Sequence, residues 1–385
     1  MNNTLQLPPI PAVVVGLCSH GLAIARALAL QGVEVHAIEA RPELPGVRTS
    51  LAKVHLVPEI RARGLIDALL HFRKQHSPNL KPVLFLTNDN MVADIAAAWE
   101  ELGDSFRLSW SASRSEVNAL LSKTEHERLS GMTNCLYPIN YSLARIGAAN
   151  ELAESLPFPV IAKPAKPLSS FKTAMANDSR ELETLLRSHQ DALPILAQKF
   201  IPGGDERIHF CAVYLRDGEI LARFDGRKLR SRPMGHTTVA EPCDADDVYE
   251  TTSRFFSATS ISGPASLELK RDKDDSLWVI EPTVGRTDFW VQVCISNGVN
   301  LPWIEYCDQV GLPIPQTAPK KQYVWVNTER DPKALLFTTA GMARGSIARR
   351  RLILPYFQAG DFRPATKATA AKIRRNISSR IRRDH

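Results

Sequence analysis

The chain has 385 residues, of which 44% are apolar and 23% charged, values that are ordinary for a globular protein with two or three domains. No apolar run reaches the roughly 18 residues of a membrane-spanning helix, and the polar, proline-rich start does not resemble a signal peptide. Six cysteines without a C-x-x-C pair argue against a disulfide framework or zinc site and favour a reducing, cytoplasmic location.

Positive charge is concentrated at the carboxyl-terminal end. The net charge is +7, but from Met342 onward twelve lysines and arginines face two aspartates, so this end contributes 12 − 2 = +10 and the rest sums to −3. This distribution argues against a nucleic-acid partner for the body. In residues 366–385, Ile373, Ile377 and Ile381 recur every four positions among arginines. We expect weak contact with an anionic membrane surface, or else a solvated or docked extension.

The first hundred residues predict a small doubly wound α/β domain. Residues 12–39 have the pattern strand, glycine turn, helix, strand, although the full G-x-G-x-x-G fingerprint is absent. Another short buried strand, 83–86, precedes a helix that extends through Leu102. Asp89 follows that strand, so it is either a ligand-binding residue at the sheet edge or the N-cap of the helix.

The middle of the chain alternates helices and strands. We predict helix over 113–130, a strand over 160–163, a helix over 178–189 and a strand over 195–200. The Asp-Gly pair at 217–218, between apolar runs, indicates a hairpin of strands 209–216 and 219–225. A helix is expected over 246–260.

Two glutamates in the segment from 266 to 282 are the most informative feature. Glu268 and Glu281 each lie beside apolar residues, and the run Arg271 to Ser276 between them is charged and turn-like. This pattern predicts an antiparallel hairpin that holds two carboxylates together. Such a pair favours a divalent cation such as Mg²⁺, completed by substrate phosphates; two strand-edge glutamates facing water are the alternative.

Several cations accompany these glutamates. Lys163 ends an apolar strand, where a lysine is uncommon unless an anion meets it, whereas Lys123 by itself is typical of a helix surface. Arg227, Lys228 and Arg230 lie close together in F-D-G-R-K-L-R, which favours phosphate or carboxylate binding over a solvated strand edge.

Taken in chain order, these pieces resemble the ATP-grasp carboxylate–amine ligases, including D-aspartate-ligase-like and carbamoyl-phosphate-synthase-like proteins. The ordered set of two lysines, strand-to-turn hinge, basic strand and two glutamates carries the resemblance over 113–309. It implies a doubly wound pre-ATP-grasp domain (1–112), a small ATP-grasp subdomain with its linker helix (113–200), a large subdomain with the metal site (201–323) and a carboxyl-terminal extension (324–385).

The resemblance also implies roles for single residues. Lys123 and Lys163 match the lysines that approach the nucleotide phosphates, and the segment Gln198, Lys199, Phe200 and Ile201 matches the hinge beside adenine. Asp205, in preference to Glu206, matches the residue that grips the ribose. Glu268 and Glu281 match the Mg²⁺ ligands, and Arg286 matches the arginine that steadies the transferred phosphoryl group. Arg227, Lys228 and Arg230 are candidates for the acceptor carboxylate or phosphate.

Two departures from the family pattern concern the metal and the lid. Where the family often has E-x-N-P-R, this chain has Glu281-Pro-Thr-Val-Gly-Arg286, so Thr283 replaces an asparagine ligand and the arginine lies one residue later. The segment after Lys163 contains no glycine, and Ser169, Ser170 and Lys172 are its candidates for covering phosphate.

The implied activity is ATP-dependent joining of a carboxylate, activated as an acyl phosphate, to an amine or amino acid, with ADP and phosphate released. The expected cofactors are ATP and Mg²⁺, with Mn²⁺ as a substitute, and the expected partners are small-molecule carboxylates and amines. A kinase, a carboxylase-type enzyme and a catalytically weak ATP-binding scaffold are the alternatives. We expect a cytoplasmic protein, peripheral at the inner membrane surface if the tail binds lipid; a homodimer is compatible with these features.

Overall fold

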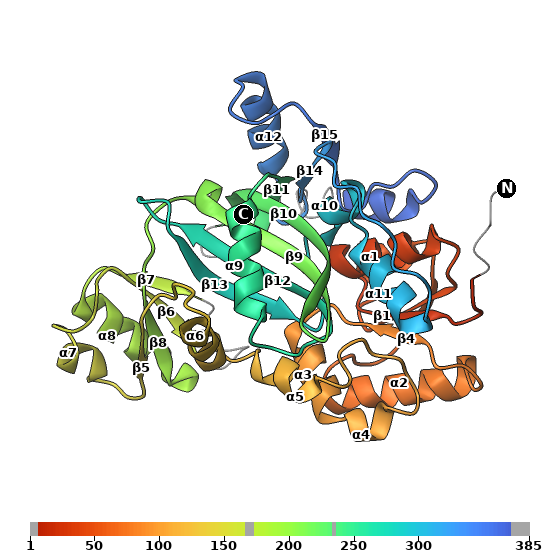
Figure 1. The fold of residues 1–385 in the computed structure, drawn as a ribbon, viewed down its shortest axis with the longest axis horizontal. Helices are drawn as coiled ribbons and strands as arrows, with labels where there is room; N and C mark the ends of the chain where they lie inside the picture. The colour runs from red at the N-terminus through yellow and green to blue at the C-terminus, as the bar shows by residue number, and fades with distance from the viewer. Residues whose placement is uncertain (1–6, 166–172, 233–235, 371–385) are drawn as a thin grey trace, which may run out of the picture.

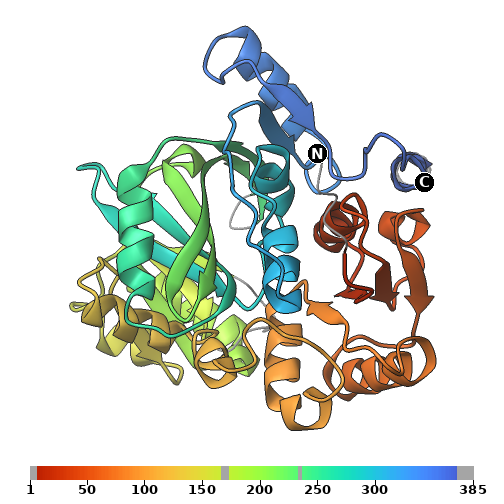
Figure 2. The same ribbon diagram turned by 45° about the vertical axis from the view of Figure 1, so that its right-hand side comes forward.

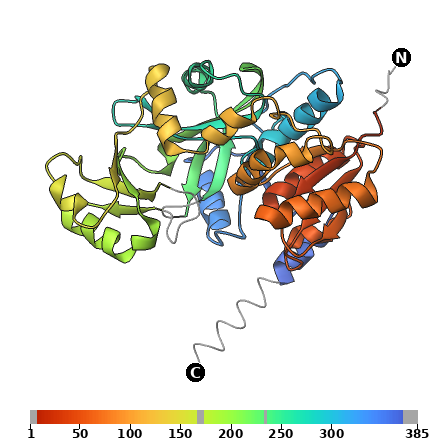
Figure 3. The ribbon, with the colours of Figure 1, turned by 90° about the horizontal axis from the view of Figure 1, so that it is seen from below.

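The computed structural model describes residues 7–165, 173–232 and 236–370. Within these residues the strands form three sheets, one from each successive third of the fold (Figure 1). Viewed from below, the first and second sheets lie at opposite ends of the molecule, with the third between them (Figure 3). No described helix is long and apolar enough to cross a membrane.

The first sheet has four parallel strands in the order β3-β2-β1-β4. Its central strands, β1 and β2, are fully buried because helices cover both faces. The predicted doubly wound domain is therefore confirmed. The elements are β1 (Ala12–Val15), α1 (Ser19–Ala29), β2 (Val35–Glu39), η1 (Pro45–Arg48), β3 (Lys53–Leu56), α2 (Ala62–His76), β4 (Val83–Phe85), α3 (Asp89–Ala97) and α4 (Trp99–Leu102).

Gly16, directly after β1, is required by the close approach of the β4 end. Its φ is +90°, and a Cβ there would lie 2.4 Å from Thr87 Oγ1. A side chain at this position would therefore strain the backbone and collide with the neighbouring strand end. The glycine lets the ends of β1 and β4 come together at the carboxyl edge of the sheet.

The second sheet is antiparallel, in the order β5-β8-β6-β7. The predicted helix over 113–130 is interrupted, because the amides of Leu121 and Ser122 bond to carbonyls three residues back in place of four. The elements are α5 (Arg114–Ala119), α6 (Lys123–Met132), β5 (Asn140–Leu143), α7 (Ala148–Glu151), β6 (Val160–Pro164), β7 (Ala174–Ala176), α8 (Ser179–Ser188), η2 (Gln190–Ala192) and β8 (Ile195–Lys199).

The third sheet has seven strands in the order β13-β12-β9-β10-β11-β14-β15. The predicted Asp217-Gly218 turn joins β9 to β10, and both turn residues have positive φ, as a two-residue hairpin requires. The elements are η3 (Asp205–Arg207), β9 (Ile208–Arg216), β10 (Glu219–Ser231), β11 (Thr237–Pro242), α9 (Asp246–Phe256), β12 (Gly263–Arg271), β13 (Leu277–Val284), α10 (Val291–Ser296), α11 (Leu301–Val310), β14 (Tyr323–Val326), α12 (Ala334–Ala343) and β15 (Arg351–Ile353).

Two strands of the third sheet come from the segment that we expected to be a separate extension. β14 pairs with β11, and β15 pairs with β14. The apolar run of β14 is buried there, so burial of this run draws residues after 323 into the large subdomain. Helices α10 and α11 lie between the third sheet and the first domain (Figure 2), where Tyr306 donates a hydrogen bond to the Ile10 carbonyl over 2.6 Å.

Candidate functional site

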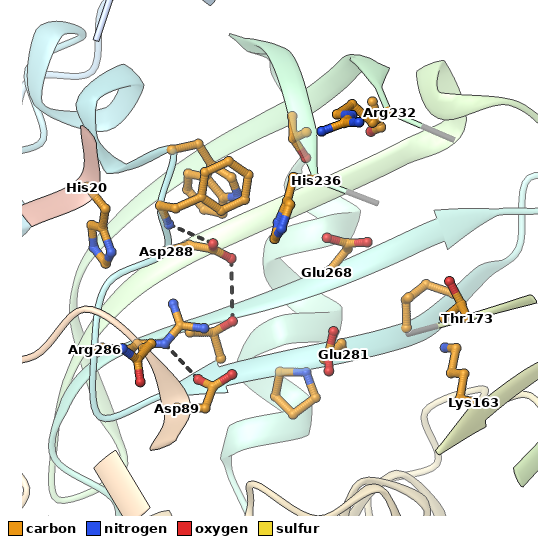
Figure 4. Close-up of a pocket in the computed structure, with 18 of the residues that line it drawn as sticks. His20, Asp89, Lys163, Thr173, Arg232, His236, Glu268, Glu281, Arg286 and Asp288 are labelled. Carbon is orange, nitrogen blue, oxygen red and sulfur yellow. Dashed lines mark hydrogen bonds and ion pairs between the residues drawn. The ribbon is translucent and has the colours of Figure 1, made fainter. Parts of the chain in front are cut away.

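A cavity of about 1240 Å³ lies where the three sheets meet. The carboxyl edge of the first sheet contributes residues 87–91, the second sheet contributes Lys163 and the end of β8, and the third sheet contributes β12 and β13. In Figure 4, Lys163 lies at one side, Glu268 and Glu281 lie in the middle, and Arg286 and His20 lie at the other side. Residues distant in sequence thus share one cavity.

The two glutamates face each other across the predicted hairpin. β12 and β13 pair antiparallel with Glu268 directly opposite Glu281, and the register shifts just after Glu268. Opposite residues of an antiparallel pair project from the same face of the sheet, and here both line the cavity. Lys228 Nζ donates to Glu268 Oε2, whereas Glu281 is exposed to solvent.

The nucleotide-binding candidates lie at the Lys163 end. Lys163 Nζ donates a 2.8 Å hydrogen bond to Gln198 Oε1; burial lowers the pKa of this lysine, and Glu281 opposes that shift. Lys199, Phe200 and Ile201, at and just after the end of β8, line the same wall. The flat strand edge and its turn are therefore arranged around one end of the cavity.

Lys123 and Asp205 also line the cavity. Lys123 is the first residue of α6, and Asp205 Oδ2 accepts a 2.5 Å hydrogen bond from the Ser231 amide. Ser169, Ser170 and Lys172 lie outside the described residues, as does the isoleucine stripe of the tail.

Arg286 is almost fully buried at the opposite end. Its Nε donates a 2.6 Å hydrogen bond to Asp89 Oδ1, and its side chain is 12% exposed. The N-cap of α3 is Asn88, whose side chain accepts from the Met91 amide, and Asp89 is the first helical residue. Of the two readings of Asp89, the cap is thus wrong, and its carboxylate faces the cavity instead.

Thr283 and Asp288 lie beside the glutamates. Thr283 Oγ1 donates a long hydrogen bond of 3.4 Å to Asp288 Oδ2, and the Phe289 amide donates to Asp288 Oδ1 over 2.7 Å. Burial raises the pKa of Asp288, whereas Arg286 and Lys228 oppose that shift. We did not single out Asp288 from the sequence; its position two residues after Arg286 was the available signal.

The basic residues Arg227, Lys228 and Arg230 of β10 point in different directions. Lys228 lines the cavity, but Arg227 points to Glu241, with Nε 2.8 Å from Oε1, and Arg230 points to Asp331 at 2.6 Å. Successive residues alternate faces, and register shifts follow Lys228 and Arg230, which redirects the later side chain. The expectation that all three bind substrate is therefore corrected, and Lys228 alone is retained.

His20 is a further cavity residue that the sequence did not identify. Its Nδ1 lies 3.3 Å from the Thr87 carbonyl, and its Nε2 lies 2.8 Å from Thr287 Oγ1. Burial, with a contribution from Arg286, lowers its pKa to about 3, so the imidazole is neutral at pH 7. The carbonyl requires the proton on Nδ1, which leaves Nε2 to accept from the threonine hydroxyl.

The described residues contain no group of three or more histidines, cysteines or carboxylates placed to hold a metal ion. Glu268 and Glu281 nevertheless provide hard oxygen donors on one face, and Thr283 lies on the same strand. A hard divalent ion bound here would take its remaining ligands from water or phosphate oxygens, as Mg²⁺ commonly does.

No family model matches the chain, and no curated protein matches it. Solved structures do match. A carboxyaminoimidazole ribonucleotide synthase from Aspergillus clavatus, complexed with ATP, has a TM-score of 0.65 at 14% identity, covering 82% of this chain and 81% of that one. A biotin carboxylase from Campylobacter jejuni has a TM-score of 0.67 at 14% identity, covering 82% and 74%.

An L-amino acid ligase from Bacillus licheniformis also matches, with a TM-score of 0.61 at 16% identity, covering 79% of this chain and 75% of that chain. At such low identity the likeness concerns the fold, because many functions share one fold. The function must therefore be argued from the residues of the cavity.

Proposed function

Because the chain has the ATP-grasp fold, we propose that it is an ADP-forming ligase that activates a carboxylate as an acyl phosphate and joins it to an amine or amino acid. One observation carries the proposal: Lys163, the Glu268–Glu281 pair and Arg286 line a single cavity. Along that cavity lie, in order, groups suited to a base, to a phosphate chain and to an acceptor.

ATP would lie with its base along Gln198 to Ile201 and its ribose near Asp205. Backbone groups of a strand that ends in a turn can pair with a flat heterocycle, and a carboxylate accepts from ribose hydroxyls. Lys163 and Lys123 would then meet the phosphates. Lys163 is half-buried, so its charge would act on phosphate with less screening by water than that of an exposed lysine.

Mg²⁺, or Mn²⁺, would be held by Glu268 and Glu281 with Thr283 nearby, and when bound it supplies charge that offsets the repulsion between phosphates and an acceptor carboxylate. Thr283 is a weak ligand because it is a neutral hydroxyl that already donates to Asp288. Lys228 holds one oxygen of Glu268, which orients that carboxylate and places a second cation beside the acceptor.

The reaction follows from the order of groups. The acceptor carboxylate attacks the γ-phosphorus of ATP, ADP leaves, and the acyl phosphate forms. Arg286 and Lys228 stabilise the charge on the transferred group. The amine then attacks the acyl carbon, loses a proton and expels phosphate. Each step needs its two reactants in line and little water, which a cavity between domains provides.

A carboxylase-type reaction is the second candidate. Two of the solved structures that match are a carboxyaminoimidazole ribonucleotide synthase and a biotin carboxylase, and this likeness favours bicarbonate as the species that is phosphorylated. The two candidates share the first chemical step and differ in the acceptor.

Purified protein with Mg²⁺ and ATP, incubated with a matrix of carboxylates, bicarbonate and amines, tests the proposal. A ligase releases ADP and phosphate in equal amounts only when a carboxylate and an amine are both present, and mass spectrometry finds an amide product. Turnover with bicarbonate in place of the organic acid would favour the carboxylase. Tight ATP binding with no turnover in any mixture would favour a scaffold and contradict both.

A further inference from the structure

The loop that carries Arg286 is held by the first domain at three consecutive residues. Trp110 Nε1 donates to the Gly285 carbonyl over 2.9 Å, Asp89 Oδ1 accepts from Arg286 Nε over 2.6 Å, and His20 Nε2 lies 2.8 Å from Thr287 Oγ1. All three partners precede residue 112, whereas the loop follows β13 of the third sheet. The position of the arginine is thus determined across a domain boundary.

The contacts leave one edge of the guanidinium available. Nε is bound by Asp89, and Nη1 donates to the Thr287 carbonyl over 3.0 Å. Among the described residues, no partner accepts a hydrogen bond from Nη2. Because the guanidinium is planar with donors in fixed directions, binding at Nε and Nη1 determines where Nη2 points. Arg286 and Asp89 both line the cavity (Figure 4).

Both members of the pair are charged. The Asp89 side chain is 49% exposed, and although partial desolvation disfavours its carboxylate, Arg286 lowers its pKa below the usual value. Burial likewise disfavours the guanidinium, yet Asp89 and Asp288 raise the pKa of Arg286. A charge-assisted hydrogen bond is stronger and more directional than a neutral one.

The backbone of the loop has little room to move. Gly285 has a φ of +71°, and a Cβ there would lie 3.0 Å from methyl groups of both Val92 and Val117. The loop therefore packs directly against α3 and α5, and Asp89 belongs to the first turn of that same α3. Rigid packing around the arginine means that loss of the Asp89 contact changes its rotamer more readily than its backbone.

We propose that Asp89 is a positioning residue that orients Arg286 toward the transferred phosphoryl group, so that the first domain completes the phosphoryl-transfer site. The proposal rests on the proposed function for the role of Arg286, but the orientation itself does not. Asp89 does not contact the reacting atoms. It acts by fixing a cation that does.

Chemical modification tests the orientation without any assay of activity. Phenylglyoxal reacts with accessible arginines, and peptide mass spectrometry measures the rate at each one. In the wild-type protein Arg286 should react slowly. In D89A, and to a smaller extent in D89N, it should react several-fold faster, whereas D89E should restore slow reaction. E101Q, which removes an exposed ion pair with Arg63 in the same domain, is the matched control and should leave the Arg286 rate unchanged.

Kinetics test the consequence. With the substrates identified by the turnover matrix, or with basal Mg²⁺-dependent ATP hydrolysis, D89N should lower kcat about 10- to 100-fold, while fluorescent-ATP titration should show nucleotide affinity close to wild type. D89N should also add little to the loss caused by R286Q, because the two residues act as one unit. Circular dichroism establishes that each variant is folded.

The outcomes are distinguishable. An unchanged Arg286 modification rate in folded D89A overturns the proposal. Independent, additive losses in D89N and R286Q also overturn it, as does a fall in nucleotide affinity that accounts for the whole loss of turnover. If the modification rate rises as expected but the wild-type protein turns over no ATP, the orientation stands and the proposed ligase function fails.

Discussion

Arg26 of α1 and Asp361, 335 residues further along the chain, form a buried ion pair with Nε 2.8 Å from Oδ2. The Asp361 carboxylate also accepts from Thr49 Oγ1 over 2.7 Å and from the Ser50 amide over 2.9 Å. Arg26 donates in addition to the carbonyls of residues 355, 356 and 361. The segment after β15 is thereby attached to the first domain.

Replacement of Asp361 by asparagine should be strongly destabilising, because it leaves the buried Arg26 guanidinium without its counter-charge. We expect a loss of about 3–5 kcal/mol in the free energy of unfolding, measured by urea denaturation. Hydrogen exchange should show lost protection in residues 351–365 first. E101Q, at an exposed ion pair, should lower the free energy of unfolding by about 0–1 kcal/mol. An equal effect of the two variants would contradict the stabilising role of the Arg26–Asp361 pair.

Replacement of Glu281 by glutamine should reduce Mg²⁺-dependent ATP turnover at least about 100-fold, because a neutral amide cannot balance the metal charge. The fold should be intact, since Glu281 is exposed. E219Q, at another exposed position of the third sheet, provides the control. Turnover close to wild type in E281Q would remove this residue from the metal site.

Replacement of Lys163 by methionine should weaken MgATP binding about tenfold or more, because a charge-assisted contact to phosphate is lost while the apolar stem is kept. Titration with a fluorescent ATP analogue measures the affinity. K81M, at an exposed lysine paired with Asp104, should bind as the wild type does. Equal affinities in K163M and K81M would refute the role of Lys163.

Glu305 of α11 should make the protein less stable as pH rises. Burial raises the pKa of Glu305 to about 8 from 4.5, although a hydrogen bond from Ser109 Oγ over 2.6 Å opposes this shift. Between these values the folded protein retains a proton that the unfolded chain releases. Ionisation of this group should therefore lower the free energy of unfolding by about 1.4 kcal/mol for each pH unit of increase across that window.

E305Q should remove this component, because glutamine is neutral at every pH. Urea denaturation from pH 5 to pH 9 compares the slopes of unfolding free energy against pH, and E305Q should give the flatter line. Superimposable slopes would show that Glu305 has an ordinary pKa.

Deletion of residues 366–385 should spare ATP turnover and reduce binding to anionic vesicles, because the positive charge of the tail would be lost. Co-sedimentation with phosphatidylserine vesicles measures the binding, with neutral phosphatidylcholine vesicles as the control. The tail has no part in membrane contact if the truncated protein sediments with anionic vesicles as the full chain does.

Elements with strong local signals were predictable. The Asp217-Gly218 turn, the buried strands of the first domain and the Glu268–Glu281 hairpin each depend on neighbouring residues, and the structure has all three. The break between α5 and α6 was missed because an apolar pattern continues through a tight turn. β14 and β15 were missed because short strands at a sheet edge carry little periodicity of their own.

The candidate site divides in the same way. Spacing and residue type predicted Lys163, Glu268 and Glu281, since a cation or carboxylate at a strand end is conspicuous within a few residues, whereas Arg286 was predicted only from the resemblance to ATP-grasp ligases. The directions in which the side chains of Arg227, Lys228 and Arg230 point depend on register shifts in β10 and on carboxylates distant in sequence. No local pattern encodes such shifts, because they arise from pairing with β11.

The local sequence was thus sufficient to predict the glutamate hairpin, the two-residue turn and the kinds of charged residue that line the cavity. Only the tertiary structure showed that Asp89 and His20 contact the loop of Arg286 and that Asp361 pairs with Arg26. It also showed that strands after residue 323 belong to the large sheet. Side-chain direction within a strand or helix follows from its neighbours in sequence. Which carboxylate meets which cation depends on how whole domains pack, and residues about 200 or 300 positions apart leave no shared local signal.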